Sequence, residues 1–187
     1  MTTSIRDTAF QLRQGRLIAL ADETGWSVAA DPINDTAVAQ LLTLLPIMPG
    51  GLQPTVLIQN TDQLILYVTK LPDVAYDLVE FAENPLTVIY EHGKNLSMRL
   101  WQTVTTPDAV GMNLTGEVAV RRSLSADVQR LIGGFSRGLL TIPFESLMLP
   151  PVAETLITER FGTLPAMPKR PRIMRLRTNG EVSFVRK

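Results

Sequence analysis

The chain has 187 residues, a length that fits one domain with a buried core. Apolar residues make up 45% and charged residues 19%, a globular composition that excludes an intrinsically disordered chain. Lysine plus arginine and aspartate plus glutamate balance at 18 each, so the net charge selects neither an anionic nor a cationic partner. Any preference for a nucleic acid or a phosphate must come from a local patch.

The residue types also restrict the chemistry. There is no cysteine, which excludes disulfides, thiolate zinc sites and a cysteine nucleophile. The single histidine, His92, lies in a turn-like segment, so we interpret it as solvent-exposed and predict no metal site. Residues 1–15 show no signal-peptide pattern, and no apolar run reaches the roughly 18–20 residues of a membrane span. We therefore expect a cytoplasmic protein with no membrane association.

In chain order, the first half alternates helix and strand patterns. Apolar spacing predicts helices over residues 3–14, 34–45 and 72–83. Asn34 and Asp35 are candidates for the N-cap of the second helix, and Pro72 suits the start of the third. Short apolar runs predict buried strands over residues 16–20, 55–58 and 86–90. The polar segment 21–27 and the Pro/Gly-rich segment 46–54 are interpreted as loops.

The second half ends in a hairpin. Strands are predicted over residues 118–120, 139–142, 173–176 and 182–185, and helices over residues 125–136 and 151–161. Gly133-Gly134 is interpreted as a helix stop, and Asn179-Gly180 is a strong signal for a tight β-turn. Interleaved helices and strands that close in a hairpin predict an α/β domain over 1–187, with a mixed sheet and flanking helices.

Four stretches, in the same order along the chain, resemble the YrdC-like (Sua/YciO/YrdC) family. Residues 15–31 resemble its opening strand and P-T-D-T-x-[YW]-G loop, and residues 81–90 resemble its F-x-x-x-P-L-T-x-I segment. Residues 116–121 correspond to G-x-V-G-[IV]-R, and residues 175–187 to the closing hairpin. The resemblance covers nearly the whole chain.

The resemblance implies a twisted mixed sheet with a concave ligand cleft. Active members of the family are L-threonylcarbamoyladenylate synthases, which condense threonine, bicarbonate and ATP into the donor for a tRNA modification. Some members have been described as binding double-stranded RNA. ATP and magnesium are therefore expected as cofactors only if this activity is retained.

The phosphate-binding motifs of the family are replaced in this chain. The cations of its K-x-R-P-x-x-K-P loop fall on Ile47, Pro49 and Gln53. Its S-x-N signature falls on Pro143 and Glu145, where a carboxylate would repel phosphate. Because fixed cations stabilise the charge of an adenylating site, these losses favour a changed site without ordinary catalysis.

The other half of the cleft is better retained. The resemblance makes Thr24, Trp26, Thr87 and Arg121 candidates for substrate binding. Arg121 could be the bidentate partner of a small carboxylate, or only an ion-pair residue at a strand end. Trp26 could form a pocket wall or core contact, or a stacking platform for a base.

Asp22 and Glu23 precede Thr24 and could suggest an acid–base pair. Adjacent strand residues point to opposite faces, and loop carboxylates are usually solvated. We therefore expect solvated carboxylates here and assign no catalytic residue.

A basic segment precedes the closing hairpin. Residues 169–177 contain five cations and no acid, and they supply the candidates for contacts with nucleic acid or phosphate: Arg170, Arg172, Arg175 and Arg177. Alternation places Arg175 and Arg177 on one face of a strand. The stripe could follow an RNA backbone, or it could be an edge strand protected by charge.

The sequence therefore predicts a YrdC-like domain that binds a nucleotide or RNA, such as double-stranded RNA or tRNA, without ordinary catalysis. One alternative is an active synthase in which Arg170 and Arg172 replace the missing cations. Another is a non-enzymatic paralogue that docks on proteins of tRNA modification.

Overall fold

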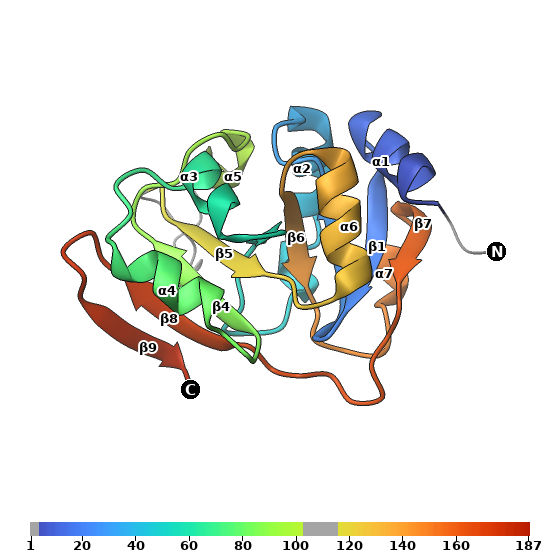
Figure 1. The fold of residues 1–187 in the computed structure, drawn as a ribbon. Helices are drawn as coiled ribbons and strands as arrows, with labels where there is room; N and C mark the ends of the chain where they lie inside the picture. The colour runs from blue at the N-terminus through green and yellow to red at the C-terminus, as the bar shows by residue number, and fades with distance from the viewer. Residues whose placement is uncertain (1–3, 103–115) are drawn as a thin grey trace.

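The protein is described here by a computed structural model, which covers residues 4–102 and 116–187. Within these residues a mixed sheet runs through the whole molecule in the order β7-β1-β2-β6-β3-β5-β4-β8-β9 (Figure 1). The strands are β1 (Leu17–Asp22), β2 (Gly25–Ala30), β3 (Thr55–Ile58), β4 (Leu86–Tyr90), β5 (Val118–Arg122), β6 (Leu139–Pro143), β7 (Ile157–Gly162), β8 (Arg172–Leu176) and β9 (Val182–Arg186).

The helices are short. They are α1 (Ile5–Arg13), α2 (Asp35–Leu42), α3 (Leu64–Tyr67), α4 (Val74–Glu80), α5 (Arg99–Gln102), α6 (Ala126–Phe135) and α7 (Pro151–Glu154), with 3₁₀ turns η1 (Leu45–Ile47) and η2 (Thr61–Gln63). None of those described has the length and apolar character needed to cross a bilayer. The predicted α/β class with a mixed sheet is confirmed: β1–β7, β3–β5 and β4–β8 pair in parallel, and the other neighbours are antiparallel.

Side-chain caps begin the longer helices. Ser4, Asn34 and Ser125 each accept a hydrogen bond from the backbone N–H three residues later, which satisfies one of the free donors of the first turn. The predicted N-cap at Asn34 is confirmed. Gly133 and Gly134 lie in the last turn of α6, and the helix ends one residue later, with Ser136 in the left-handed region.

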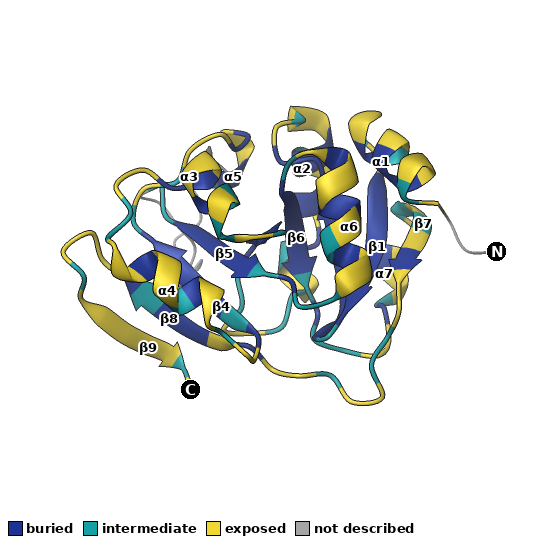
Figure 2. Ribbon diagram, viewed as in Figure 1, coloured by how far each residue is buried: buried dark blue, intermediate teal, exposed yellow. Residues whose placement is uncertain are grey.

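The strands bury both of their faces. Alternate residues such as Ile18, Leu20 and Leu57 face α1 and α6, and the residues between them face a second core that includes α2 and α4. The central strands are accordingly buried, whereas β9 at one edge is exposed (Figure 2). The α1–α6 layer covers only part of its face of the sheet, and the candidate site lies on the same face beyond this layer.

The prediction of a loop over residues 21–27 is wrong. This segment continues β1, turns at Glu23 and Thr24, and returns as β2. Its polar residues predicted a solvent-exposed loop. The local sequence does not show that distant parts of the chain bury these residues and pair with them. In the structure, Asp22, Thr24 and Ser27 are all buried.

The helix predicted over residues 151–161 is also wrong beyond its first turn. Helix α7 ends at Glu154, and Ile157–Gly162 forms β7, which pairs in parallel with β1 at the edge of the sheet. The pairing partner lies about 140 residues earlier in the chain, so a tertiary contact decides this segment against its local pattern.

Candidate functional site

Polar side chains gather on one face of the central strands. Thr87 of β4 lies opposite Arg121 of β5, and Thr55 of β3 lies opposite Thr141 of β6. These residues continue, at alternate positions, the strand face that carries Leu57, Ala119 and Ile89. A face that is apolar along most of its length therefore ends in threonines and one arginine.

The β1–β2 turn supplies the acidic part of the site. Thr24 donates to Asp22 Oδ1 from its backbone N–H at 2.8 Å and from its hydroxyl at 2.7 Å. The next residue, Gly25, has φ +101°, and a Cβ there would lie 2.5 Å from the backbone oxygen of Ser146. The turn is thus held by its own side chains and by close packing against the chain after β6.

Arg121 is the centre of a buried ion-pair network. Its Nη2 lies 2.7 Å from Asp22 Oδ2, and its Nη1 lies 2.6 Å from Glu23 Oε1. The side chains of Arg121 and Asp22 are only 5% and 1% exposed. Glu23 Oε1 also accepts from the backbone N–H of Leu124 at 3.1 Å. The expectation that Asp22 and Glu23 are solvated is wrong, because the folded chain brings Arg121 between them.

The electrostatics agree with this geometry. Burial acts to lower the pKa of Arg121, but the carboxylates of Asp22 and Glu23 outweigh it, so the pKa lies above its ordinary value. The guanidinium is held as a cation whose charge is already compensated by the protein. An external carboxylate would have to displace these partners.

A third carboxylate closes the far side of the site. Glu145, in the left-handed backbone region at φ 51°, accepts a bidentate pair from Arg186 at 2.6 and 3.0 Å. Arg186 also donates to the carbonyl oxygen of Pro171. The contact joins the closing strand β9 to the segment after β6 by a charge-assisted, two-point interaction.

Little free space remains between these groups. The cavity measures about 20 Å³, which is room for about one water molecule. Its lining consists of Thr24, Leu52, Gln53, Thr55, Thr87, Arg121, Thr141, Pro143, Glu145, Pro171 and Ile173.

Three of the four predicted substrate-binding residues meet here: Thr24, Thr87 and Arg121. Trp26 does not line this cavity. It is 8% exposed and packs in the core, with the guanidinium of Arg160 at 5.5 Å from its ring centroid. Its geometry is that of a core contact and not of an open stacking platform.

The residues at the family's phosphate-binding motifs are divided. Of the three at its cation positions, Gln53 lines the cavity and Ile47 and Pro49 do not. Pro143 and Glu145, at its S-x-N signature, both line the cavity. The side of the site where the family resemblance places phosphate contacts therefore presents an amide, a proline ring and a carboxylate.

The four arginines of the basic segment have different surroundings. Arg175 pairs with Glu117, Arg177 lies 3.9 Å from Glu181, and Arg170 lies 3.9 Å from Glu145. Among the described residues Arg172 has no acidic partner, and it faces the α4 side of the sheet with Met174. The segment thus distributes its charges over both faces of β8.

The sequence reasoning missed the partners of two arginines. Asp22 and Glu23 lie 99 and 98 residues from Arg121, and Glu145 lies 41 residues from Arg186. No rule of sequence spacing connects residues so far apart. The one feature of the sequence that could have indicated the Arg121 network was the pair of acids, Asp22 and Glu23, directly before Thr24 of the family motif.

The comparisons with known proteins agree with this fold. The Sua5/YciO/YrdC family model, described as "Telomere recombination", matches residues 11–143. The chain belongs to the Sua5/YciO/YrdC family. This assignment confirms the resemblance that the four sequence stretches indicated. No curated protein sequence matches the chain.

Solved structures of the family share the fold at low identity. YciO of E. coli is 18% identical with a TM-score of 0.73, and the match covers 98% of this chain and 88% of YciO. A double variant of P. abyssi Sua5 is 19% identical with a TM-score of 0.70, and the match covers 92% of this chain and 50% of Sua5. Sua5 of P. abyssi complexed with L-threonine is 21% identical, with the same TM-score and coverage. This family member therefore spans about half the length of Sua5.

Proposed function

We propose that this chain is a non-catalytic relative of the threonylcarbamoyladenylate synthases that binds RNA or a nucleotide. Family membership relates it to the biosynthesis of threonylcarbamoyladenosine in tRNA. The observation that carries the proposal is the buried network of Arg121, Asp22 and Glu23. Of the described residues that line the cavity, Arg121 is the one cation, and carboxylates of the same chain occupy it.

Phosphate binding gives the physical argument. A charge-assisted hydrogen bond contributes about 1.5–3 kcal/mol, so the loss of three cations weakens triphosphate binding by several orders of magnitude. Glu145 adds a carboxylate where the family has an amide, and the cavity has room for about one water. The lining residues therefore do not fit a triphosphate with its magnesium ion.

The test of lost catalysis is pyrophosphate release from ATP in the presence of threonine and bicarbonate. We expect none above the enzyme-free rate, with an active family member as the positive control. Turnover that disappears in Arg121→Ala would overturn the proposal. Turnover that survives this change but is lost in Arg170→Gln/Arg172→Gln would support an enzyme with relocated cations.

Exposed cations beside the cleft support the binding part of the proposal. Lys169, Arg170 and Arg172 are exposed and close in sequence, and Arg172 has no ion pair within the described residues. Each contact between such a cation and a phosphate releases a counterion, which makes the affinity depend on salt.

RNA binding is tested by titrating a short duplex RNA at low and moderate salt. We expect the affinity to fall with salt and to be lost in Arg170→Gln/Arg172→Gln/Arg177→Gln. Arg130→Gln is the matched control, because Arg130 is equally exposed but lies on α6. Binding that the triple change leaves intact would contradict the role of this segment. Absence of all RNA and nucleotide binding would favour the interaction-only paralogue instead.

A further inference from the structure

The sheet has two edges of different character. Edge strand β7 carries Glu159 and Arg160 among its six residues, and such charges oppose pairing with another chain. The opposite edge strand, β9, is uncharged over residues 182–185. Its apolar residues Val182, Phe184 and Val185 are 44%, 52% and 52% exposed. Most of strand β9 is accordingly coloured as exposed in Figure 2. Edge β9 therefore lacks the charges that protect β7.

The backbone of β9 is arranged for a further strand. The N–H of Arg177 donates to the carbonyl of Glu181 at 2.9 Å, and Ser183 lies opposite Arg175. Because alternate residues of an antiparallel strand bond to the same neighbour, Glu181 and Ser183 direct their backbone groups toward β8. Val182 and Phe184 consequently direct theirs outward from the sheet.

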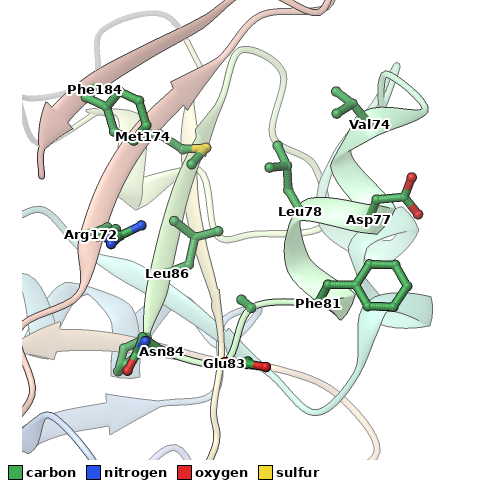
Figure 3. A pocket seen from close by; sticks show the side chains of 12 residues that line it. Val74, Asp77, Leu78, Phe81, Glu83, Asn84, Leu86, Arg172, Met174 and Phe184 are labelled. Atoms are coloured by element: carbon green, nitrogen blue, oxygen red, sulfur yellow. The ribbon is translucent and has the colours of Figure 1, made fainter.

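The same two residues carry side chains on one face. Phe184 lies opposite Met174 and lines a groove of about 560 Å³ between α4 and the β8–β9 hairpin. Leu78 of α4 lies on one side of this groove, and Leu86, Met174 and Phe184 of the sheet lie on the other (Figure 3). Val182 is two residues from Phe184 and so belongs to the same face. This face would extend an apolar surface across any added strand.

We propose that β9 is the dimerisation surface of this protein and that its partner is the β9 strand of a second copy. The two strands run antiparallel about a two-fold axis at Ser183. Val182 of each copy then lies opposite Phe184 of the other, and each of these two pairs exchanges two backbone hydrogen bonds. An aromatic side chain beside a β-branched one is a favourable cross-strand pair.

The charges at the ends of β9 agree with this direction. Glu181 precedes the strand and Lys187 follows it, whereas Arg186, the last strand residue, is already paired with Glu145. Antiparallel pairing brings the acidic start of one strand beside the basic end of the other, whereas parallel pairing would place like charges together. A register shift between Phe184 and Arg186 interrupts the ladder there and confines the contact to the centre of the strand.

The proposed β9–β9 contact limits the assembly to two copies. Both copies use the same surface, so a β9–β9 pair leaves no second β9 edge free. The remaining edges of the joined sheet are the charged β7 strands. The expected assembly is a dimer and not a fibre.

Sedimentation equilibrium of the full chain tests the proposal. Strand pairing forms a small interface, so we expect a shift from monomer to dimer between about 5 and about 500 µM. Val182→Pro removes one outward N–H and leaves the β8 ladder in place, and Phe184→Lys places like charges across the axis. Each change should abolish the dimer. Phe10→Lys alters a similarly exposed phenylalanine on α1, outside the groove, and should leave the dimer intact.

Hydrogen–deuterium exchange tests the pairing directly in the wild-type chain. The amides of Val182 and Phe184 should become protected as the concentration rises, whereas that of Ser183 should be protected throughout by β8. Thermal melting of each variant shows whether it is folded. A wild-type monomer at the highest concentration would overturn the proposal, as would a dimer that survives both β9 changes.

Discussion

At the scale of single residues, Arg121 determines how the candidate site can work. Its two carboxylate partners come from the β1–β2 turn, and all three groups are largely withdrawn from water. A buried ion pair contributes little net stability when it is intact, but removal of one partner leaves uncompensated charge in the interior. The arrangement thus makes Arg121 structurally essential whatever its ligand.

Arg121→Met should lower the free energy of unfolding by about 3–5 kcal/mol, because the buried Asp22 and the mostly buried Glu23 are left without their cation. Urea denaturation measures the loss. The triple variant Asp22→Asn/Glu23→Gln/Arg121→Met should recover much of it, since no buried charge remains. Arg130→Met removes only an exposed pair and should cost less than about 1 kcal/mol. An equally small loss for Arg121→Met would contradict the network.

Two buried tyrosines differ in whether the hydroxyl group has a hydrogen-bond partner. The Tyr67 hydroxyl accepts a hydrogen bond from the backbone N–H of Gly138 at 2.7 Å, whereas the Tyr90 hydroxyl has no partner among the described residues. Burial raises the pKa of both side chains above the ordinary value. Both are therefore neutral at physiological pH, and the hydrogen bond distinguishes them.

Tyr67→Phe should destabilise the protein by about 1–3 kcal/mol, because the buried N–H of Gly138 loses its acceptor. Tyr90→Phe should be neutral or stabilising, because it removes a hydroxyl that is buried without a partner. Thermal or urea unfolding of the two variants gives the comparison. Equal changes in stability for the two variants would show that the Tyr67–Gly138 hydrogen bond does not stabilise the fold.

At the scale of elements, the β1–β2 hairpin presents the acids of the network. Its turn depends on a glycine with positive φ that lies against the backbone of Ser146. The N-cap at Asn34, the apolar strands and the Asn179-Gly180 hairpin were predictable, because each depends on residues only a few positions apart. This hairpin was not, because its polar residues are buried by partners from β5 and from the segment after β6.

Gly25→Ala should destabilise the hairpin strongly, since the added Cβ would lie 2.5 Å from the Ser146 oxygen and the backbone would also be strained. Gly180→Ala is the matched control: its φ is +88°, but nothing lies within 4 Å of the added Cβ. We expect Gly180→Ala to cost about 1 kcal/mol and Gly25→Ala clearly more. If both variants lower the melting temperature by a similar amount, backbone strain explains the loss and the contact with Ser146 adds nothing to it.

At the scale of the whole molecule, one sheet connects all parts of the described chain. Strands β3 and β5 pair at its centre and join the half that holds β1, β2, β6 and β7 to the half that holds β4, β8 and β9. The Arg121 network crosses this junction, because it links β5 to the β1–β2 turn. The two halves should therefore unfold together.

The two tryptophans can report this cooperativity. Trp26 lies on β2 in one half, and Trp101 donates to the carbonyl of Glu117 beside β5 in the other. The variants Trp26→Phe and Trp101→Phe leave one fluorescent reporter each. Their fluorescence transitions in urea should coincide with far-UV circular dichroism of the same variant. Separate midpoints for the two signals would show that the halves unfold independently.

The sequence by itself determined the mixed α/β class, most strands, the helix cap at Asn34 and the family. These features arise from periodicity, capping and turn chemistry, which act over a few residues. The tertiary structure alone decided that residues 157–162 form an edge strand, that Asp22 is buried and Glu23 mostly so, and that Arg121 is their partner. Each of these depends on which strands lie side by side, and local sequence patterns carry no record of contacts between residues 98 or more positions apart.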